Sequence, residues 1–342
     1  MSDSKALNMP YVWMICLVAA CGGLLFGYDW VVIGGAKPFY EAYFGITDAA
    51  MSGWAMSSAL LGCVLGAAGS GTLSDRYGRR LPLIIAAVLF TASGVGTALA
   101  DSFNSFVFWR IVGGVGIGLA SALAPVYIAE ISPAEKRGRF VAVNQLTIVL
   151  GVLAAQLINL MIAEPVASAA VQADILQSWN GQTGWRYMFG AEAIPAAIFL
   201  ALMFVVPESP RWLAKANRYP QAEKVLQRIG SVEYARETLA PVTWVLLSEI
   251  FPNRVRGNAM AVGTLALWIA CFLLTYTFPL MNAALGAAGS FFIYAVICLA
   301  GWIFIQCKVP ETRGVTLEVL EQRLSRTDAE RKAEKAVASE SH

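Results

Sequence analysis

The chain has 342 residues, of which 57% are hydrophobic and only 14% are charged, whereas soluble domains carry about 25% charged residues. This composition and a mean hydropathy of +0.60 exclude a water-soluble globular protein and a disordered chain. The net charge of +2 argues against nucleic-acid binding. The only histidine is His342, which excludes a histidine-based active site. The composition therefore predicts a membrane protein.

Eight apolar runs reach the length of about 20 residues that a helix needs to cross a membrane. In chain order they cover residues 11–35, 53–73, 81–100, 106–129, 140–162, 187–206, 259–281 and 289–307. A ninth stretch, 240–252, gives only about 20 Å of helix and carries Glu249. We expect this stretch to be a re-entrant or interfacial piece that does not cross the membrane.

Basic residues are divided very unequally between alternate loops. If the N-terminus is cytoplasmic, 22 of the 25 lysines and arginines lie on the inner side, which is a strong positive-inside bias. The sequence thus predicts a multi-pass protein of the cell's inner membrane with both termini in the cytoplasm. Residues 207–239 are polar, with charges at helical spacing, and predict a cytoplasmic helical linker. The charged segment 310–342 predicts a cytoplasmic tail.

A charged loop, GTLSDRYGRR, joins the second and third runs from Gly71 to Arg80. Its pattern G-x3-D-R-x-G-R-R resembles the hallmark of the major facilitator superfamily. Other segments resemble the sugar porter family, and in particular bacterial sugar–proton symporters of the xylose-transporter kind. These segments are GGLLFGYD (22–29), RIVGGVGIGLASALAPVYIAE (110–130), NQL (144–146), WRYMF (185–189), PESPRWL (207–213), PVTWVLLSEIFPNRVRG (241–257) and PETRG (310–314).

The resemblance implies an all-α polytopic fold in which two six-helix halves rock around a sugar site at mid-membrane. Residues 1–206 resemble the complete N-terminal half. The chain then passes from the linker to the end of the family's tenth helix, so helices 7–9 and the start of helix 10 have no counterpart. Residues 240–309 would form a truncated C-terminal half with a short partial helix and two spans. We expect polar groups that lose their neighbours, such as Arg110 and Gln145, to face lipid or a partly collapsed cavity.

Three ionisable residues fall inside apolar runs: Asp29, Arg110 and Glu192. A charge near mid-membrane is costly unless it is paired or faces water, so each is a candidate functional residue. Pairing of Asp29 with Arg110 is the simplest arrangement. Resemblance to the symporters implies that Asp29 is the protonatable site that couples sugar to proton, whereas a purely structural ion pair is the alternative. Glu192 fits either a proton path or a polar helix contact.

Five residues are candidates for sugar binding. The amide of Gln145 both donates and accepts hydrogen bonds, which suits a ligand rich in hydroxyls, and the matching glutamine of the family contacts sugar. Asn159 roughly follows the same helix face, although an interhelical hydrogen bond explains it nearly as well. Phe26 flanks Asp29, and Trp244 and Trp268 match family positions that line the site. Many tryptophans of membrane proteins lie at the membrane–water interface, and this is the alternative explanation for Trp244 and Trp268.

Charged residues also gather where the loops are expected to be cytoplasmic. In the family, matching residues form ion-pair networks that close the inner gate, and such networks bias a two-state equilibrium. Topology-setting surface charge is the alternative, but it does not explain the acids beside the basic residues. The candidates are Asp75, Arg76, Arg79, Arg80, Glu130, Arg137, Glu208, Arg211, Glu249 and Arg256, followed by Glu311 and Arg313.

Three classes of function remain. The leading hypothesis is a secondary transporter that moves a monosaccharide, a pentose or hexose, together with protons across the bilayer. The second is a non-transporting remnant that binds sugar or a partner only. The third, an intramembrane enzyme, has little support because Asp29 stands without a second aspartate in any span. No cofactor, metal or nucleic acid is expected, and a homo-oligomer in which two copies complement each other stays open.

Overall fold

The computed structural model describes residues 7–165, 172–236, 238–239 and 254–308. These residues are almost entirely helical, and no strand occurs among them. The chain forms two compact units, Met1–Ala284 and Leu285–His342. The all-α fold class expected from the sequence is confirmed. The finer division into four regions (1–206, 207–239, 240–309 and 310–342) stays a prediction.

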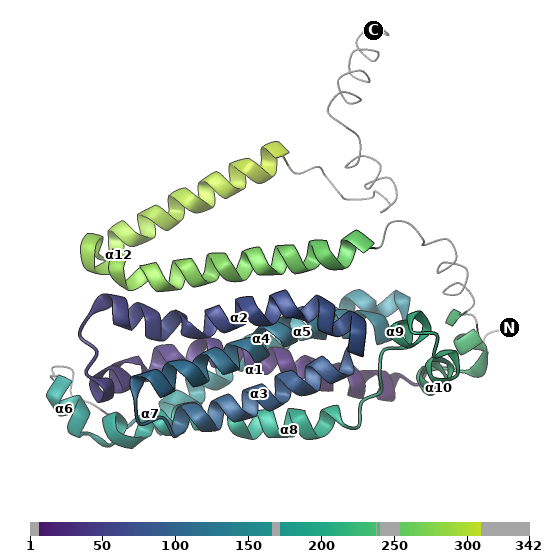
Figure 1. Cartoon of the computed structure of the whole chain (residues 1–342), viewed down its shortest axis with the longest axis horizontal. Helices are drawn as coiled ribbons and strands as arrows, with labels where there is room; N and C mark the ends of the chain where they lie inside the picture. Colours follow the sequence, from purple (N-terminus) through teal and green to yellow (C-terminus); the bar gives the residue numbers. More distant parts are fainter. Residues whose placement is uncertain (1–6, 166–171, 237, 240–253, 309–342) are drawn as a thin grey trace, which may run out of the picture. The chain divides into compact units, whose positions relative to one another are not determined.

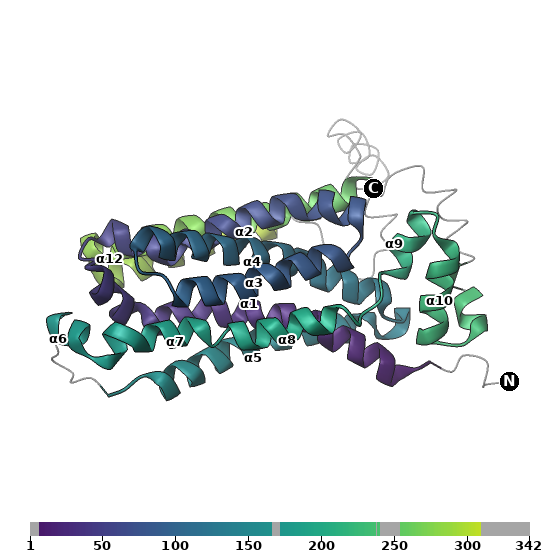
Figure 2. The same ribbon diagram turned by 60° about the horizontal axis from the view of Figure 1, so that its bottom comes forward.

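The first unit is built on five long helices that lie side by side (Figures 1 and 2). They are α1 (Met9–Phe44), α2 (Ala49–Tyr77), α3 (Arg80–Ala98), α4 (Phe103–Ile131) and α5 (Arg137–Ile162), with a 3-10 turn, η1 (Ala134–Lys136), before α5. The most extensive pairings are α2 with α4 and α1 with α5. Side-chain oxygens of Asn8, Asp48 and Ser102 cap the N-termini of α1, α2 and α4, which satisfies amides that have no intrahelical partner.

The sixth predicted span, 187–206, begins earlier in the structure than in the sequence analysis. After the short α6 (Gln172–Gln177), a π-helical turn η2 (Asn180–Gly184) continues into α7 (Trp185–Gly190) and α8 (Ala193–Met203). Asn180 is fully buried. Its amide accepts from the Glu164 N–H at 3.0 Å and donates to the Glu164 carbonyl at 2.8 Å. This two-way pairing ties the start of the span to the end of α5.

The segment after α8 is helical, as expected of the linker. It holds α9 (Pro210–Lys215), which Ser209 caps, and α10 (Tyr219–Ile229). The helix α10 buries Ala222, Val225, Leu226 and Ile229 along one side. That spacing of three and four residues is typical of an amphipathic helix packed on a core.

The last two predicted spans lie within α12 (Arg254–Lys308). Its backbone leaves the helical conformation at Gly286, with φ 69° and ψ 174°, which glycine adopts without a steric penalty. Among the described residues, seven helical stretches are long and apolar enough to cross a membrane, and the last, Thr264–Phe304, has 41 residues. Since that stretch contains the Gly286 break, it accommodates both predicted spans. The protein is a multi-pass membrane protein.

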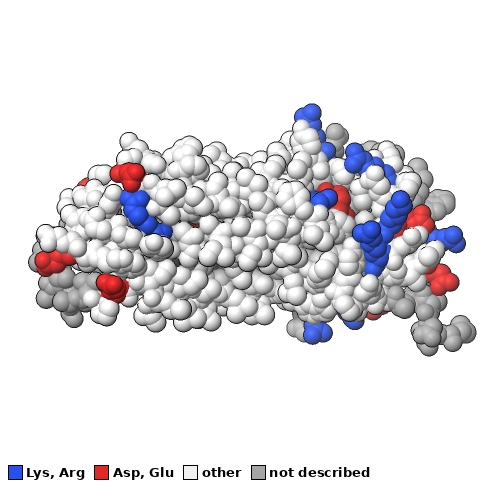
Figure 3. Space-filling model, turned by 90° about the horizontal axis from the view of Figure 1, so that it is seen from below, with Lys and Arg blue, Asp and Glu red and all other residues white. Residues whose placement is uncertain are grey.

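Charged side chains on the face in Figure 3 gather at the two ends of the bundle and leave an uncharged band between them. Large apolar side chains are exposed on the helices, for example Phe108 at 58% and Leu160 at 73%. Such exposure is costly in water and natural in hydrocarbon. The surface therefore fits a lipid environment.

Candidate functional site

The interior of the bundle holds a buried ion pair. Arg110 of α4 donates from Nη1 to Oδ1 of Asp29 of α1, and the exposed fractions of the two side chains are 3% and 4%. The predicted pairing is confirmed. The expectation that Arg110 faces lipid is wrong, because the side chain is buried, α1 supplies the counter-ion, and the guanidinium carbon lies 5.5 Å from the centre of the Phe189 ring. Both partners of this contact belong to the first unit.

Glu192 lies against the same pair. It sits between α7 and α8, is 2% exposed, and interacts electrostatically with both Asp29 and Arg110. Within the described part of the chain, Nε of Arg110 is buried and has no hydrogen-bond partner. Three ionisable groups therefore share one dry compartment in which two carboxyls face a single guanidinium, and one of the guanidinium's donors is unused.

Aromatic rings gather beside this compartment. The Trp268 ring of α12 lies 5.5 Å from that of Phe26 and 6.1 Å from that of Trp30. Trp268 is 3% exposed, and among the described residues its indole N–H has no acceptor. Two of the predicted sugar-binding residues, Phe26 and Trp268, are thus brought together. Trp30, which like Phe26 flanks Asp29 in the sequence and offers a ring on which a sugar could stack, joins them.

The two polar candidates on α5 differ in their surroundings. The Gln145 side chain is exposed. Asn159 is 5% exposed and donates from Nδ2 to the Val32 carbonyl of α1 at 3.3 Å. This bond is the interhelical contact that the sequence left open as the alternative to sugar binding. Among the described residues the Gln145 side chain has no hydrogen-bond partner, whereas the amide donor of Asn159 is already engaged.

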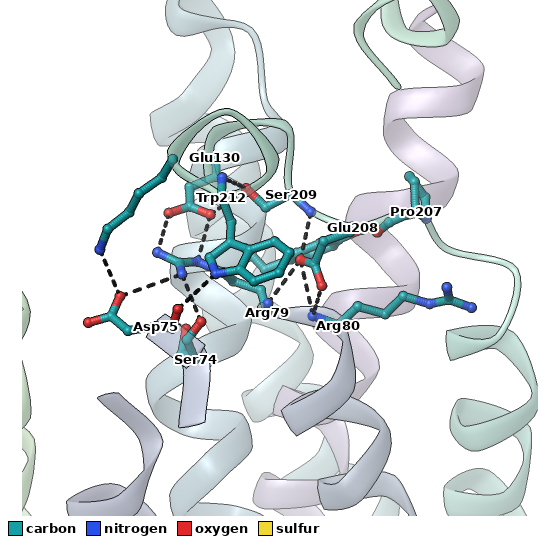
Figure 4. A network of polar contacts seen from close by, with 11 residues as sticks. Ser74, Asp75, Arg79, Arg80, Glu130, Pro207, Glu208, Ser209 and Trp212 are labelled. Carbon is teal, nitrogen blue, oxygen red and sulfur yellow. Dashed lines mark hydrogen bonds and ion pairs between the residues drawn. The ribbon is translucent and has the colours of Figure 1, made fainter. Parts of the chain in front are cut away.

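A second polar site lies where α2, α3 and α4 meet the segment leading into α9 (Figure 4). Arg79 donates from Nε and Nη2 to the two carboxylate oxygens of Glu130, each at 2.9 Å. The Ser209 hydroxyl donates to the same carboxylate at 2.6 Å. Asp75 is 3.8 Å from Nη1 of Arg79. The bidentate Arg79–Glu130 pair is the strong part of this cluster, because two parallel charge-assisted bonds fix its geometry.

Glu208 caps the start of α3 from outside the helix. Its carboxylate accepts from the backbone N–H of Arg79 at 2.9 Å, of Arg80 at 3.1 Å and of Ser209 at 2.7 Å. Burial raises the pKa of Glu208, and the three backbone N–H donors oppose that rise. A Cβ placed on Gly78 would lie 2.2 Å from the Glu208 carboxylate. Only glycine therefore allows this approach.

Several predicted network residues make other contacts. Arg80 donates to the carbonyls of Met203 and Phe204, and Arg137 donates to the Ala129 carbonyl at 2.9 Å. The remaining two arginines are exposed: Arg76 stacks on Tyr77, and neither Arg76 nor Arg211 makes an ion pair among the described residues.

Other contributors to this site were missed. The Ser209 hydroxyl donates to Glu130, and the Trp212 indole N–H donates to the backbone carbonyl of Asp75. The Lys215 ammonium donates to the Asp75 carboxylate, and the Tyr127 hydroxyl donates to the Pro207 carbonyl. Ser209 and Trp212 belong to the PESPRWL motif, which could have indicated their part in this site.

Some candidates fall outside the described residues. These are Trp244, Glu249, Glu311 and Arg313, and also the side chain of Arg256, whose backbone belongs to α12. Within the residues that the structure describes, no group of three His, Cys, Asp or Glu side chains could hold a metal ion. The site as described is therefore one of ion pairs, amides and aromatic rings.

Comparison with known proteins agrees with this architecture. The D-xylose-proton symporter of Escherichia coli (strain K12) is 30% identical over 479 aligned residues, covering 92% of this chain and 96% of the symporter. A structure titled as the partially occluded inward open conformation of the xylose transporter XylE from E. coli superposes with a TM-score of 0.78. It is 27% identical and covers 88% of this chain and all of that one.

A second XylE structure is titled as the major facilitator superfamily proton:xylose symporter bound to 6-bromo-6-deoxy-D-glucose. It has a TM-score of 0.75 and is 30% identical, covering 92% of this chain and 99% of that one. An alignment of 479 residues exceeds the 342 of this chain, so the relative holds an internal block that this chain lacks. The family described as "Sugar (and other) transporter" matches in two pieces, 15–239 and 234–324, which places the break at the predicted position. The chain belongs to this sugar transporter family, within the major facilitator superfamily.

Proposed function

We propose that the chain moves a monosaccharide across the membrane together with a proton, by alternating access. Among solved relatives, the XylE symporter is titled as bound to a bromodeoxyglucose and as a proton:xylose symporter. The observation that carries the proposal is the compartment formed by Asp29, Arg110 and Glu192, which lies beside the aromatic cluster of Phe26 and Trp268. A monosaccharide, a pentose or hexose, is the proposed substrate.

The charge balance of this compartment supports proton coupling. Two carboxylates facing one guanidinium leave one negative charge uncompensated, and an uncompensated buried charge is costly. The compartment is therefore best satisfied when it holds one proton. Movement of the Arg110 guanidinium away from Asp29 would favour protonation, and its return would favour release, because an opposite charge favours the ionised carboxylate. Asp29 and Glu192 are the proposed proton carriers.

The surroundings of the compartment support sugar recognition. Aromatic rings accept the apolar face of a sugar, and an unpaired indole N–H and a free amide bond to its hydroxyls. Trp268, Phe26 and Gln145 supply these groups, and we assign Trp244 to the same site. Asn159 lies 14 residues beyond Gln145, about 21 Å along α5, so we assign it to the interhelical bond with Val32. Together with Glu249 and Arg256 of the C-terminal part, the Arg79–Glu130 cluster would stabilise the state in which the cytoplasmic end is closed. In this proposal both termini lie in the cytoplasm, and the protein resides in the inner membrane.

The test is uptake of radiolabelled D-xylose into proteoliposomes with and without an inward proton gradient. Asp29→Asn imitates the protonated carboxyl, so we expect loss of gradient-driven accumulation with retention of sugar exchange down a concentration gradient. Asp101→Asn is the control, because the Asp101 carboxylate is 88% exposed and lies outside the compartment. Equal accumulation by Asp29→Asn and the parent would refute proton coupling at Asp29.

A second candidate function rests on the missing block. Since the family match breaks between residues 234 and 239, the cavity lacks the helices that would close its other side. The chain would then bind a monosaccharide or a partner and transport nothing, unless two copies complement each other. Equilibrium dialysis with D-xylose distinguishes the two: binding by inserted protein that shows no uptake and no exchange supports this second function.

A further inference from the structure

The helix α5 presents two different exposed strips. One strip contains Leu146, Leu150, Leu153 and Leu157, whose side chains are 45–56% exposed and apolar, as expected for a surface in contact with lipid. The other strip contains Gln145, Val149, Val152 and Gln156, at the helical spacing i, i+4, i+7 and i+11, and all but the half-buried Val152 are exposed. Both of its glutamines are exposed.

The two glutamine side chains have no hydrogen-bond partner among the described residues, although each offers two donors and an acceptor. In hydrocarbon, unsatisfied groups of this kind cost several kcal/mol each. The strip therefore faces water or a polar ligand. The sequence predicts a sugar-binding role for Gln145 and none for Gln156.

Contacts between α1 and α5 fix which residues lie at the same height. A Cβ on Gly151 would lie 2.0 Å from the Leu24 carbonyl oxygen, so the two backbones touch there. Eight residues further along α5, Asn159 donates to the carbonyl of Val32, eight residues further along α1. The helices therefore run parallel and in step, with an offset of 127 residues.

With this offset, Trp30 lies level with Leu157. It is therefore within one residue of the height of Gln156 along the helix axis. Seen along the chain, residues of a right-handed helix advance clockwise by about 100°. Trp30 lies about a third of a turn anticlockwise of Leu24, where α1 meets α5. Gln156 lies about a quarter turn clockwise of the α5 surface that meets α1. On parallel helices these two directions open to the same side, and Trp30 is 41% exposed.

Gln156 cannot share one sugar molecule with Gln145. Eleven residues of helix separate them by about 16 Å along the axis, which is beyond the reach of a monosaccharide. We propose that Trp30 and Gln156 form a second sugar subsite, in which the indole stacks on the apolar face of the ring and the amide bonds to its hydroxyls. The class of ligand rests on the function proposed above.

Trp268 connects the two subsites. Its ring lies 6.1 Å from Trp30 and 5.5 Å from Phe26, and its buried indole N–H has no acceptor among the described residues. A sugar leaving one subsite would stay in contact with this ring while it enters the other. Two weak subsites in series suit a transporter, because binding must be strong enough for entry and weak enough for release.

Single-cysteine labelling tests the second subsite. Gln156→Cys and Leu157→Cys are compared in lipid nanodiscs with a charged methanethiosulfonate reagent, and the parent chain sets the background from its own cysteines. Leu157 is adjacent in sequence and 50% exposed on the leucine strip, which makes it a matched control. We expect Gln156→Cys to react at least about tenfold faster, because hydrocarbon excludes the charged reagent. We also expect D-xylose to slow the reaction while sorbitol has no effect.

D-xylose must still slow the labelling of the double variant Gln145→Ala/Gln156→Cys, because the second subsite binds sugar without Gln145. Equal rates for the two cysteine variants would overturn the proposal, since the glutamine strip would then face lipid. Protection that disappears in the double variant would also overturn it, leaving one sugar site. If D-xylose binds the parent chain in equilibrium dialysis without slowing the labelling of Gln156→Cys, the second subsite fails and the proposed function survives. If D-xylose does not bind the parent chain, both fail.

Discussion

Replacing Gly78 by alanine should break the cap that Glu208 places on α3. The backbone of Gly78 has φ 92° and ψ −176°, a region that is essentially restricted to glycine. A Cβ there would also come within 2.2 Å of the Glu208 carboxylate. The alanine must therefore either change the turn or push the carboxylate away from the amides of Arg79, Arg80 and Ser209.

The magnitude follows from these two effects. Backbone strain of this kind costs about 1–3 kcal/mol, and each lost hydrogen bond to a charged acceptor costs about 1.5–3 kcal/mol. Strain with the loss of a single bond gives about 3 kcal/mol. Since 1.4 kcal/mol corresponds to a factor of ten, local opening of this turn should become more than about a hundredfold easier.

Hydrogen–deuterium exchange in nanodiscs measures this opening directly. Peptides containing the amides of Arg79, Arg80 and Ser209 should exchange more than about a hundredfold faster in Gly78→Ala than in the parent. Gly71→Ala is the control, because Gly71 is helical and a Cβ there meets open space, so it should be neutral or slightly stabilising. Unchanged protection in Gly78→Ala would refute the reasoning, because neither strain nor displacement would then operate.

Three further predictions concern stability. Arg110→Leu should lower the unfolding free energy in detergent by about 3–5 kcal/mol, because Asp29 is left buried and unpaired; adding Asp29→Leu should recover most of this loss, and no recovery would argue against the pair. Asn180→Ala should cost about 2–3 kcal/mol, because both backbone groups of Glu164 lose their partner, and a thermal melt equal to that of the parent would contradict this. Glu208, whose pKa burial raises from 4.5, stabilises the fold most when protonated, so the parent should lose stability relative to Glu208→Gln as pH rises above 4.5; a pH-independent difference in melting temperature would be inconsistent with this sign.

The sequence allowed the ion pair to be predicted for a physical reason. A charge inside an apolar run has few acceptable partners, and Arg110 and Asp29 were the obvious ones. The Arg79–Glu130 pair was accessible in the same way, because the loop motif marks one partner and the acid at the end of the fourth run marks the other. In both cases the constraint was local enough, or costly enough, to leave little choice.

Other features depend on distances that the sequence does not encode. Nothing in a list of charges indicates that Arg137 donates to a carbonyl while Arg79 finds a carboxylate. Phe189 over Arg110 and Gly78 beneath Glu208 arise only when helices far apart in sequence are packed. The early start of the sixth span had one polar signal, Asn180, whose pairing with the Glu164 backbone cannot be read from hydropathy.

The Arg79–Glu130 cluster has a mechanical consequence. Every partner described for it lies between Ser74 and Lys215, so it fastens α2, α3, α4 and α9 to one another. Bonds confined to one group of helices do not have to break when that group tilts as a unit. We therefore expect the cluster to brace these helices, so that this end of the bundle tilts without bending. If the cluster is weakened, part of any tilt would be lost as bending between these helices.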